Sequence, residues 1–195
     1  MGRTAQIKRD TSETEISVSL NLDGKGEHDI KTSIPFLDHM LAQVARHGLF
    51  DITVKAKGDT HIDFHHTVED VGITLGQAFA KALGDKKGIR RFSDVSIPLN
   101  EALAQCVIDI SGRAFLIFNV DLPKTKIGEF DVELVSEFFH AFAGNSGITI
   151  HINSPYWTNL HHVVEAIFKS FARALDHACS LDPRTKDIPS TKGRL

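Results

Sequence analysis

Two five-residue stretches share one pattern and decide how the chain is interpreted: His65-His66-Thr67-Val68-Glu69 and His161-His162-Val163-Val164-Glu165. Each begins a segment whose apolar residues recur at helical spacing, which predicts helices over Thr67–Leu83 and His162–Cys179. On a helix, the first histidine and the glutamate four residues later point the same way. Each motif therefore offers a histidine–carboxylate pair that can bind one metal ion.

The segments before the two motifs also match, because each is a helix followed by a strand. We predict these elements over Leu37–Arg46 and Asp51–Lys57 in the first case, and over Val132–Ala143 and Gly147–Asn153 in the second. When Ile52 is aligned with Ile150, His39 falls on Glu137. The repeated order of helix, strand, loop and motif indicates an internal duplication.

Further strands are predicted ahead of these units, over Arg3–Thr11, Glu15–Leu22, His28–Ser33, Leu99–Ile110 and Ala114–Val120. A basic, turn-rich bridge, Gly84–Pro98, is expected to join the halves. We therefore predict an α+β fold of two similar half-domains, residues 1–90 and 91–180, each a mostly antiparallel sheet with helices on one face. Residues 181–195 are expected to form an irregular tail.

Composition narrows the possible classes of protein. The chain has 195 residues, 42% of them hydrophobic, and a net charge of −3, which argues against a nucleic-acid-binding or disordered protein. It has no apolar run of membrane-spanning length, so we expect no membrane association. Two cysteines form no disulfide framework, which favours a reducing, cytoplasmic location.

The second histidine of each motif, His66 or His162, lies about 100° around the helix from its neighbour and does not readily bind the same ion. Two metal sites are therefore suggested, each combining the His/Glu pair of one motif with the second histidine of the other. His39 and Glu137 are the natural additional ligands. Adjacent histidines at a helix start are often merely solvated, but two copies at equivalent positions favour metal binding. Imidazole and carboxylate without thiolate fit Mn, Fe, Co, Ni or Zn, and leave the metal open.

Other polar residues are less specific. The run Asp59–Asp63 either supplies acceptors that orient the imidazoles or is an ordinary polar loop. An anion site is suggested by Arg90, Arg91, Arg113, Lys169 and Ser190-Thr191-Lys192, although each charge taken singly is more often solvated. Lys169 follows His161 by two helical turns on the same side. His47 has the same relation to His39, but is also a typical helix C-terminal histidine.

Many motifs in order along nearly the whole chain support a resemblance to a known family. They are Arg9-x-Thr11-x-Glu13-Thr14, Phe36–Leu41, His47-Gly48, Gly58–Asp70, Lys87-Gly88-Ile89-x-Arg91-Phe92, Ser111-Gly112-Arg113, His161-His162-x-x-Glu165-x-x-Phe168-Lys169 and Ile188-Pro189-Ser190-x-Lys192-Gly193. The sequence resembles the imidazoleglycerol-phosphate dehydratase family of histidine biosynthesis. The resemblance implies dehydration of D-erythro-imidazole-glycerol phosphate to imidazole-acetol phosphate.

The resemblance also implies two Mn²⁺ ions per active site. It assigns His39, His66, His161 and Glu165 to one ion, and His65, Glu69, Glu137 and His162 to the other. Glu13, Glu69 and Glu165 are implied to be catalytic, with Glu13 the candidate that moves the proton. The implied substrate-binding residues are Glu13, His39, His47, His65, His66, Glu69, Arg91, Arg113, His161, Lys169, Ser190, Thr191 and Lys192. The implied fold is like the second domain of ribosomal protein S5, in a 24-subunit homo-oligomer whose active sites lie between subunits.

The chain departs from the family pattern at three places. Glu137 stands where the family often has histidine, and a carboxylate can still ligate a metal. The segment Asn153–Trp157 replaces a more basic, glycine-containing stretch. Thr191 replaces a serine and keeps the hydroxyl.

Two other classes of function remain open on the residues. A dinuclear metallohydrolase would release inorganic phosphate through a metal-bound hydroxide. A non-enzymatic assembly protein would use its ions only to join subunits, but it gives no reason for the basic residues beside the metal ligands.

Overall fold

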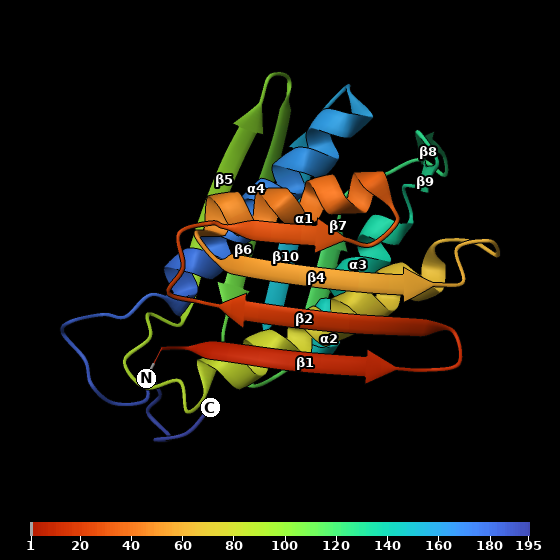
Figure 1. The fold of residues 1–195 in the computed structure, drawn as a ribbon. Helices are drawn as coiled ribbons and strands as arrows, with labels where there is room; N and C mark the ends of the chain where they lie inside the picture. The colour runs from red at the N-terminus through yellow and green to blue at the C-terminus, as the bar shows by residue number, and fades with distance from the viewer. Residues whose placement is uncertain (1) are drawn as a thin grey trace.

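The structure is a computed structural model that describes residues 2–195 (Figure 1). Its first half contains β1 (Thr4–Asp10), β2 (Thr14–Asn21), β3 (His28–Lys31), α1 (Pro35–Gly48), β4 (Asp51–Gly58) and α2 (His65–Leu83). The second half contains β5 (Phe92–Leu99), β6 (Ala102–Asp109), β7 (Phe115–Asn119), β8 (Lys126–Ile127), β9 (Phe130–Asp131), α3 (Leu134–Ser146), β10 (Thr149–Tyr156) and α4 (Leu160–Cys179).

The two large sheets have the same connectivity. Their strand orders are β1-β2-β4-β3 and β5-β6-β10-β7. In each sheet the first two pairings are antiparallel and the last, between β3 and β4 or between β7 and β10, is parallel. Helices α1 and α3 are the crossovers that parallel neighbours require. The predicted α+β fold with a repeated, mostly antiparallel sheet is therefore confirmed.

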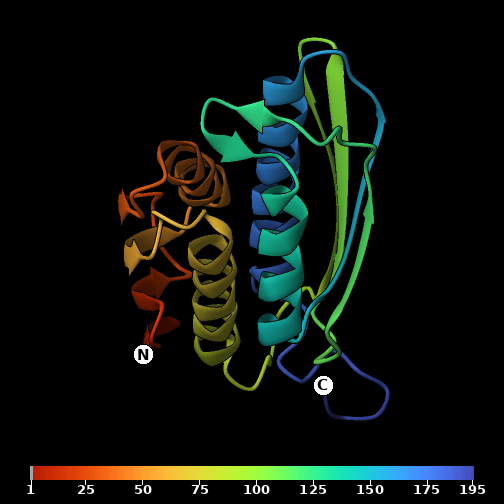
Figure 2. The same ribbon diagram turned by 90° about the vertical axis from the view of Figure 1, so that its right-hand side faces the viewer.

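The helices lie between the two sheets, so the molecule has a sheet–helix–helix–sheet layering (Figure 2). Helix α1 packs against α4, and α2 packs against α3. The α2–α3 contact is close because α2 has glycines there. A Cβ at Gly72 would lie 2.8 Å from the carbonyl oxygen of Phe138, and one at Gly76 would lie 2.6 Å from that of Phe142. The helix layer also holds a cluster of buried aromatic rings, Phe79, Phe138, Phe139, Phe142, Phe168 and Phe171.

The predicted bridge Gly84–Pro98 is wrong in part, because its second portion is strand β5. Strand β5 is at the edge of its sheet, where a proline such as Pro98 is tolerated. The single strand expected over Leu99–Ile110 is interrupted by a turn at Asn100 and Glu101, and Asn100 has a φ of 49°. The β8–β9 hairpin was not predicted, since two-residue strands leave no alternation to detect.

Within the described residues, no helix is both long enough and apolar enough to span a membrane.

Candidate metal centre

One compact group of potential metal ligands joins α1 to α4. The Nε2 atoms of His39 and His161 lie 3.2 Å and 3.1 Å from Oε2 of Glu165. All three ligating atoms lie within 4.8 Å of one another, and no other group of three or more such residues meets this criterion in residues 2–195. His161 and Glu165 share a face as their spacing predicts, and the α1–α4 contact brings His39 to them. We call this group the α1–α4 triad.

Glu165 is the most constrained member of the α1–α4 triad. Its side chain is 14% exposed, and Oε1 accepts a bond from Nζ of Lys169 at 2.5 Å. Burial alone would raise the pKa of Glu165, but the bonds from Lys169, His39 and His161 outweigh it and lower the pKa to about 2. The carboxylate is therefore ionised across the physiological pH range, as a metal ligand must be.

The α1–α4 triad borders an apolar pocket of about 400 Å³, because His39 and His161 are among the residues that line it. Phe36, Phe64 and Phe130 contribute to its lining, and the ring of Phe36 meets that of His161 edge-on at a centroid distance of 5.4 Å. Apolar surroundings lower the local dielectric, which strengthens the attraction between a cation and its ligands.

The corresponding residues around the first motif do not meet the same 4.8 Å criterion among residues 2–195. Nε2 of His65 lies 4.0 Å from Oε2 of Glu69, and the two side chains are 44% and 46% exposed. Glu137 is on α3, the helix that packs against α2, next to the Phe138 carbonyl that approaches Gly72. Glu137 makes no hydrogen bond or ion pair with any residue that the structure describes. We call His65, Glu69 and Glu137 the α2–α3 triad.

The second histidine of each motif is held through its Nδ1 atom. His66 Nδ1 lies 2.9 Å from Oδ2 of Asp59 and 3.7 Å from Oε2 of Glu13. The bond to Asp59 raises the pKa of His66. Asp59 thus performs the orienting role that is one of the two alternatives for its loop. His162 Nδ1 lies 3.0 Å from Oε2 of Glu101.

Glu101 was missed in the sequence because the turn that contains it was not recognised. The bond from His162 lowers the pKa of Glu101 to about 2. The internal repeat offered a signal, since Glu13 occupies the corresponding turn between β1 and β2.

The structure does not bring the two motifs together in one chain. The α1–α4 triad does not include His66, and His162 has no contact with the α2–α3 triad among the hydrogen bonds and ion pairs of residues 2–195. The crossed arrangement inferred from the spacing is therefore absent within a single described chain.

The predicted anion-binding residues form two groups. Arg91 Nε and Arg113 Nη2 lie 2.7 Å and 3.7 Å from the carboxylate oxygens of Asp109. Arg91 also donates to the Pro189 carbonyl at 2.8 Å, which places the tail segment Ser190–Lys192 next to this group. Arg91 has a φ of 73°, and such strained backbone is typically concentrated at functional sites.

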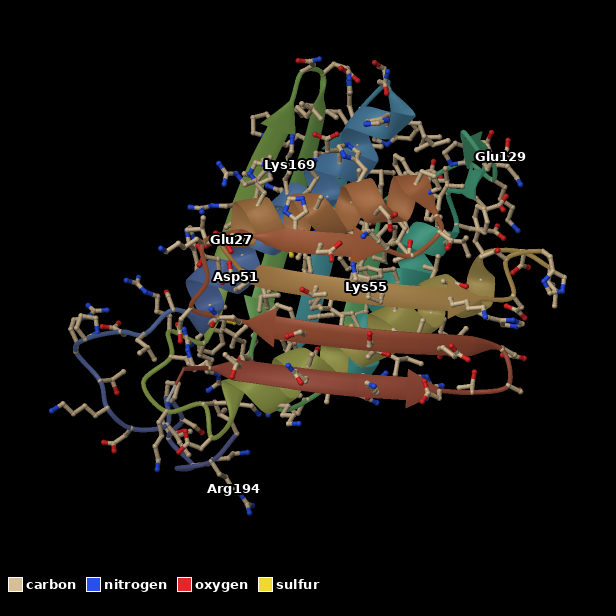
Figure 3. All side chains as sticks on the ribbon, viewed as in Figure 1. Glu27, Asp51, Lys55, Glu129, Lys169 and Arg194 are labelled. Carbon is tan, nitrogen blue, oxygen red and sulfur yellow. The ribbon has the colours of Figure 1, made fainter. Side chains whose placement is uncertain are left out.

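The second group is His47 and Lys169, near the α1–α4 triad. Burial, and then the positive charges of Lys169 and Arg173, lower the pKa of His47, so its ring is neutral at pH 7. The Arg91 backbone N–H donates to the carbonyl oxygen of Ala178 on α4. Ala178 is nine residues beyond Lys169, which corresponds to about 13 Å along the helix. Lys169 lies where α1 crosses α4, while the tail, marked by Arg194, lies at the other end of the molecule (Figure 3).

The donor set fits a divalent metal ion. Neutral imidazole nitrogens and ionised carboxylates suit first-row metals such as Mn²⁺, and both described cysteines are buried away from the cluster. Fold and site together define a duplicated α+β protein with a histidine–carboxylate centre. The model of the family "Imidazoleglycerol-phosphate dehydratase" matches residues 32–175. The chain belongs to the imidazoleglycerol-phosphate dehydratase family and is an enzyme, a hydro-lyase.

Individual relatives agree over the full length. The chain is 60% identical over 195 residues to the imidazoleglycerol-phosphate dehydratase of Pelobacter propionicus, with all of both chains covered. The same figures hold for that of Geobacter metallireducens. The crystal structure of the enzyme from Staphylococcus aureus is 40% identical, with a TM-score of 0.83, over 92% of this chain and 99% of that one. A Pyrococcus furiosus structure, in complex with (S)-C348, is 34% identical with the same TM-score, over 97% of this chain and all of that one.

Proposed function

We propose that this chain dehydrates D-erythro-imidazole-glycerol phosphate to imidazole-acetol phosphate in histidine biosynthesis, with Mn²⁺ as its metal. Membership of the family supports the reaction. The observation that carries the proposal is the α1–α4 triad, which presents two imidazole nitrogens and a carboxylate oxygen to one point beside Lys169. A cytoplasmic location remains a prediction.

Two Mn²⁺ ions would be held by the two triads. The α1–α4 triad with a His66 would hold one ion, and the α2–α3 triad with a His162 would hold the other. When bound, the ions supply Lewis acidity and a template for the substrate's imidazole ring. Glu69 and Glu165 would contribute to catalysis as ligands.

A second copy of the chain would complete each active site. His66 and His162 each have Nδ1 tied to a carboxylate, which leaves Nε2 for a further partner. Neither histidine has a hydrogen bond or ion pair, among residues 2–195, with the triad that it is expected to join, so the fourth ligand would come from a neighbouring subunit. The family resemblance favours a 24-subunit homo-oligomer.

The substrate's phosphate would be bound by the basic residues, and Asp109 keeps Arg91 and Arg113 close together for this purpose. Lys169, Ser190, Thr191 and Lys192 would add further donors, and His47 a neutral ring. Arg91 meets α4 at Ala178, about 13 Å along the helix from Lys169, so an active site between subunits would let the two basic groups come from different copies of the chain.

Glu13 would move the substrate's proton. Its carboxylate is 50% exposed and lies 3.7 Å from Nδ1 of the proposed ligand His66, so it is close to that residue without a hydrogen bond to it. A Glu13→Gln variant is expected to lose about 10²–10⁴-fold in kcat while binding Mn²⁺ normally. Unchanged turnover would remove Glu13 from this role.

The direct test is an assay of the purified, Mn²⁺-loaded protein with imidazole-glycerol phosphate. We expect the keto phosphate to appear without release of inorganic phosphate, and activity to disappear after chelation and return with Mn²⁺. Release of phosphate would instead identify a metallohydrolase. Dissociation of the oligomer on chelation, with no turnover by the loaded protein, would identify an assembly protein.

A further inference from the structure

The two β-hairpin turns that precede the metal motifs carry corresponding glutamates. Glu13 is in the turn between β1 and β2, and Glu101 is in the turn between β5 and β6. Each carboxylate faces the second histidine of the motif in its own half. Glu13 Oε2 lies 3.7 Å from Nδ1 of His66, whereas Glu101 Oε2 lies 3.0 Å from Nδ1 of His162. Only the second contact, between Glu101 and His162, is short enough for a hydrogen bond.

The difference comes from the loops that lead into α2 and α4. In the first half, the loop after β4 supplies Asp59, whose Oδ2 lies 2.9 Å from Nδ1 of His66. In the second half, the connection after β10 is Trp157-Thr158-Asn159, which contains no carboxylate. Glu101 therefore occupies at His162 the position that Asp59 occupies at His66.

Glu101 is also fixed to the start of α4. Its Oε1 accepts the backbone N–H of Asn159 at 2.8 Å. The Asn159 side chain in turn accepts the backbone N–H of His162 at 3.2 Å. The Glu101 carboxylate therefore accepts hydrogen bonds from the backbone at the start of α4 and from the His162 ring. These two bonds fix its position.

A carboxylate that accepts Nδ1–H selects one tautomer of histidine and directs the Nε2 lone pair outward. We propose that Glu101 is the positioning residue of His162, and that it sets the tautomer and orientation in which His162 ligates Mn²⁺ through Nε2. This inference rests on the proposed function, because it takes His162 to be a metal ligand. It assigns to Glu101 in the second half the role that Asp59 has in the first.

The test uses the full-length protein, stripped of metal and titrated with Mn²⁺ by calorimetry, with metal content checked by mass spectrometry. Glu101→Ala is expected to lower the affinity for one of the two Mn²⁺ ions about 10–100-fold and to leave the affinity for the other unchanged. Glu101→Gln retains an oxygen that can accept the Nδ1–H of His162, so its loss of Mn²⁺ affinity should be smaller. Asp94→Ala removes an exposed carboxylate from the same hairpin and should bind both ions normally.

Two further variants separate positioning of His162 from capping of helix α4. Asn159→Ala removes the side-chain cap of α4 and should lower the Tm of the metal-free protein without lowering its affinity for Mn²⁺. If Asn159→Ala lowers the affinity for Mn²⁺ as much as Glu101→Ala does, Glu101 acts by capping the helix and the inference is overturned.

The His162→Ala variant should lose one ion. If the His162→Ala variant loses one ion but the Glu101→Ala variant binds both ions tightly, the inference fails and the proposed function stands. If the His162→Ala variant also binds both ions, the proposed set of metal ligands is wrong.

Discussion

The two triads come from the same motif on the same fold, yet only one is tightly assembled. In the α1–α4 triad, Glu165 is 14% exposed and bonded to two imidazoles and Lys169, whereas Glu69 in the α2–α3 triad is 46% exposed and 4.0 Å from its histidine. The position four residues after Glu165 is Lys169, and the position four residues after Glu69 is Ile73. Two partners therefore distinguish the fixed carboxylate: the cation one helical turn later, Lys169, and the imidazole that α1 supplies, His39.

The largest effect should come from the same substitution made in both triads. Glu165→Gln and Glu69→Gln are each expected to lower kcat/KM by about 10³-fold, or about 4 kcal/mol, because each removes one charged ligand. Only Glu165→Gln should also destabilise the metal-free protein, by about 1–2 kcal/mol, since it leaves Lys169 without its carboxylate. Kinetics and urea unfolding of the metal-free variants measure the two effects. Equal loss of stability in both variants would contradict the role given to Lys169.

The next effect concerns the helix contact that supports the α2–α3 triad. Gly72→Ala should destabilise the protein by about 2 kcal/mol, or roughly 4–8 °C in Tm, because the new methyl group meets a backbone carbonyl that cannot easily move. The matched control is Gly144→Ala on α3, where no atom lies within 4 Å of the added carbon. There the loss of backbone freedom should stabilise the protein by about 0.5–1 kcal/mol. A thermal shift of the same sign in both variants would show that the contact is looser than described.

The smallest effect should come from changing the ligand type within the α2–α3 triad. Glu137→His installs the residue that the family often has, and should keep kcat/KM within about tenfold, or about 1.4 kcal/mol, since imidazole also ligates Mn²⁺. Glu137→Ala removes the ligand and should lower both activity and metal content. Metal analysis beside the kinetics decides the matter, because full metal content in Glu137→Ala would exclude Glu137 from the ligand set.

Much of the fold followed from the sequence, because periodicity reports which side of an element is buried. Helix α4 was expected from His162 and begins at Leu160, and the repeated order of elements indicated two sheets with one connectivity. Periodicity failed where the chain turns within a β-rich region. The turn at Asn100 and Glu101 contains no glycine or proline, so the sequence pattern places most of β5 in the bridge Gly84–Pro98 and starts a strand at Leu99, ahead of the turn.

The candidate site was predictable only in part. Helical spacing is a local property, so the pairing of His161 with Glu165 could be expected from the motif alone. The partner of that pair depends on which helices pack together, and only the structure shows α1 against α4, which joins His39 to it. Glu101 lies 61 residues from His162, a separation at which spacing carries no information.

The layering also bears on whether a half of the molecule can exist alone. Each large sheet makes its ladder hydrogen bonds within its own half, but the helix face that points away from that sheet is covered only by the helices of the other half (Figure 2). A cut near residue 90 would expose the glycine face of α2 in the first half, and buried phenylalanines of α3 and α4 in the second. Either fragment would have to pair with another like itself or aggregate. Carrying both halves on one chain keeps the two helix layers together at any protein concentration, without the encounter of two separate molecules.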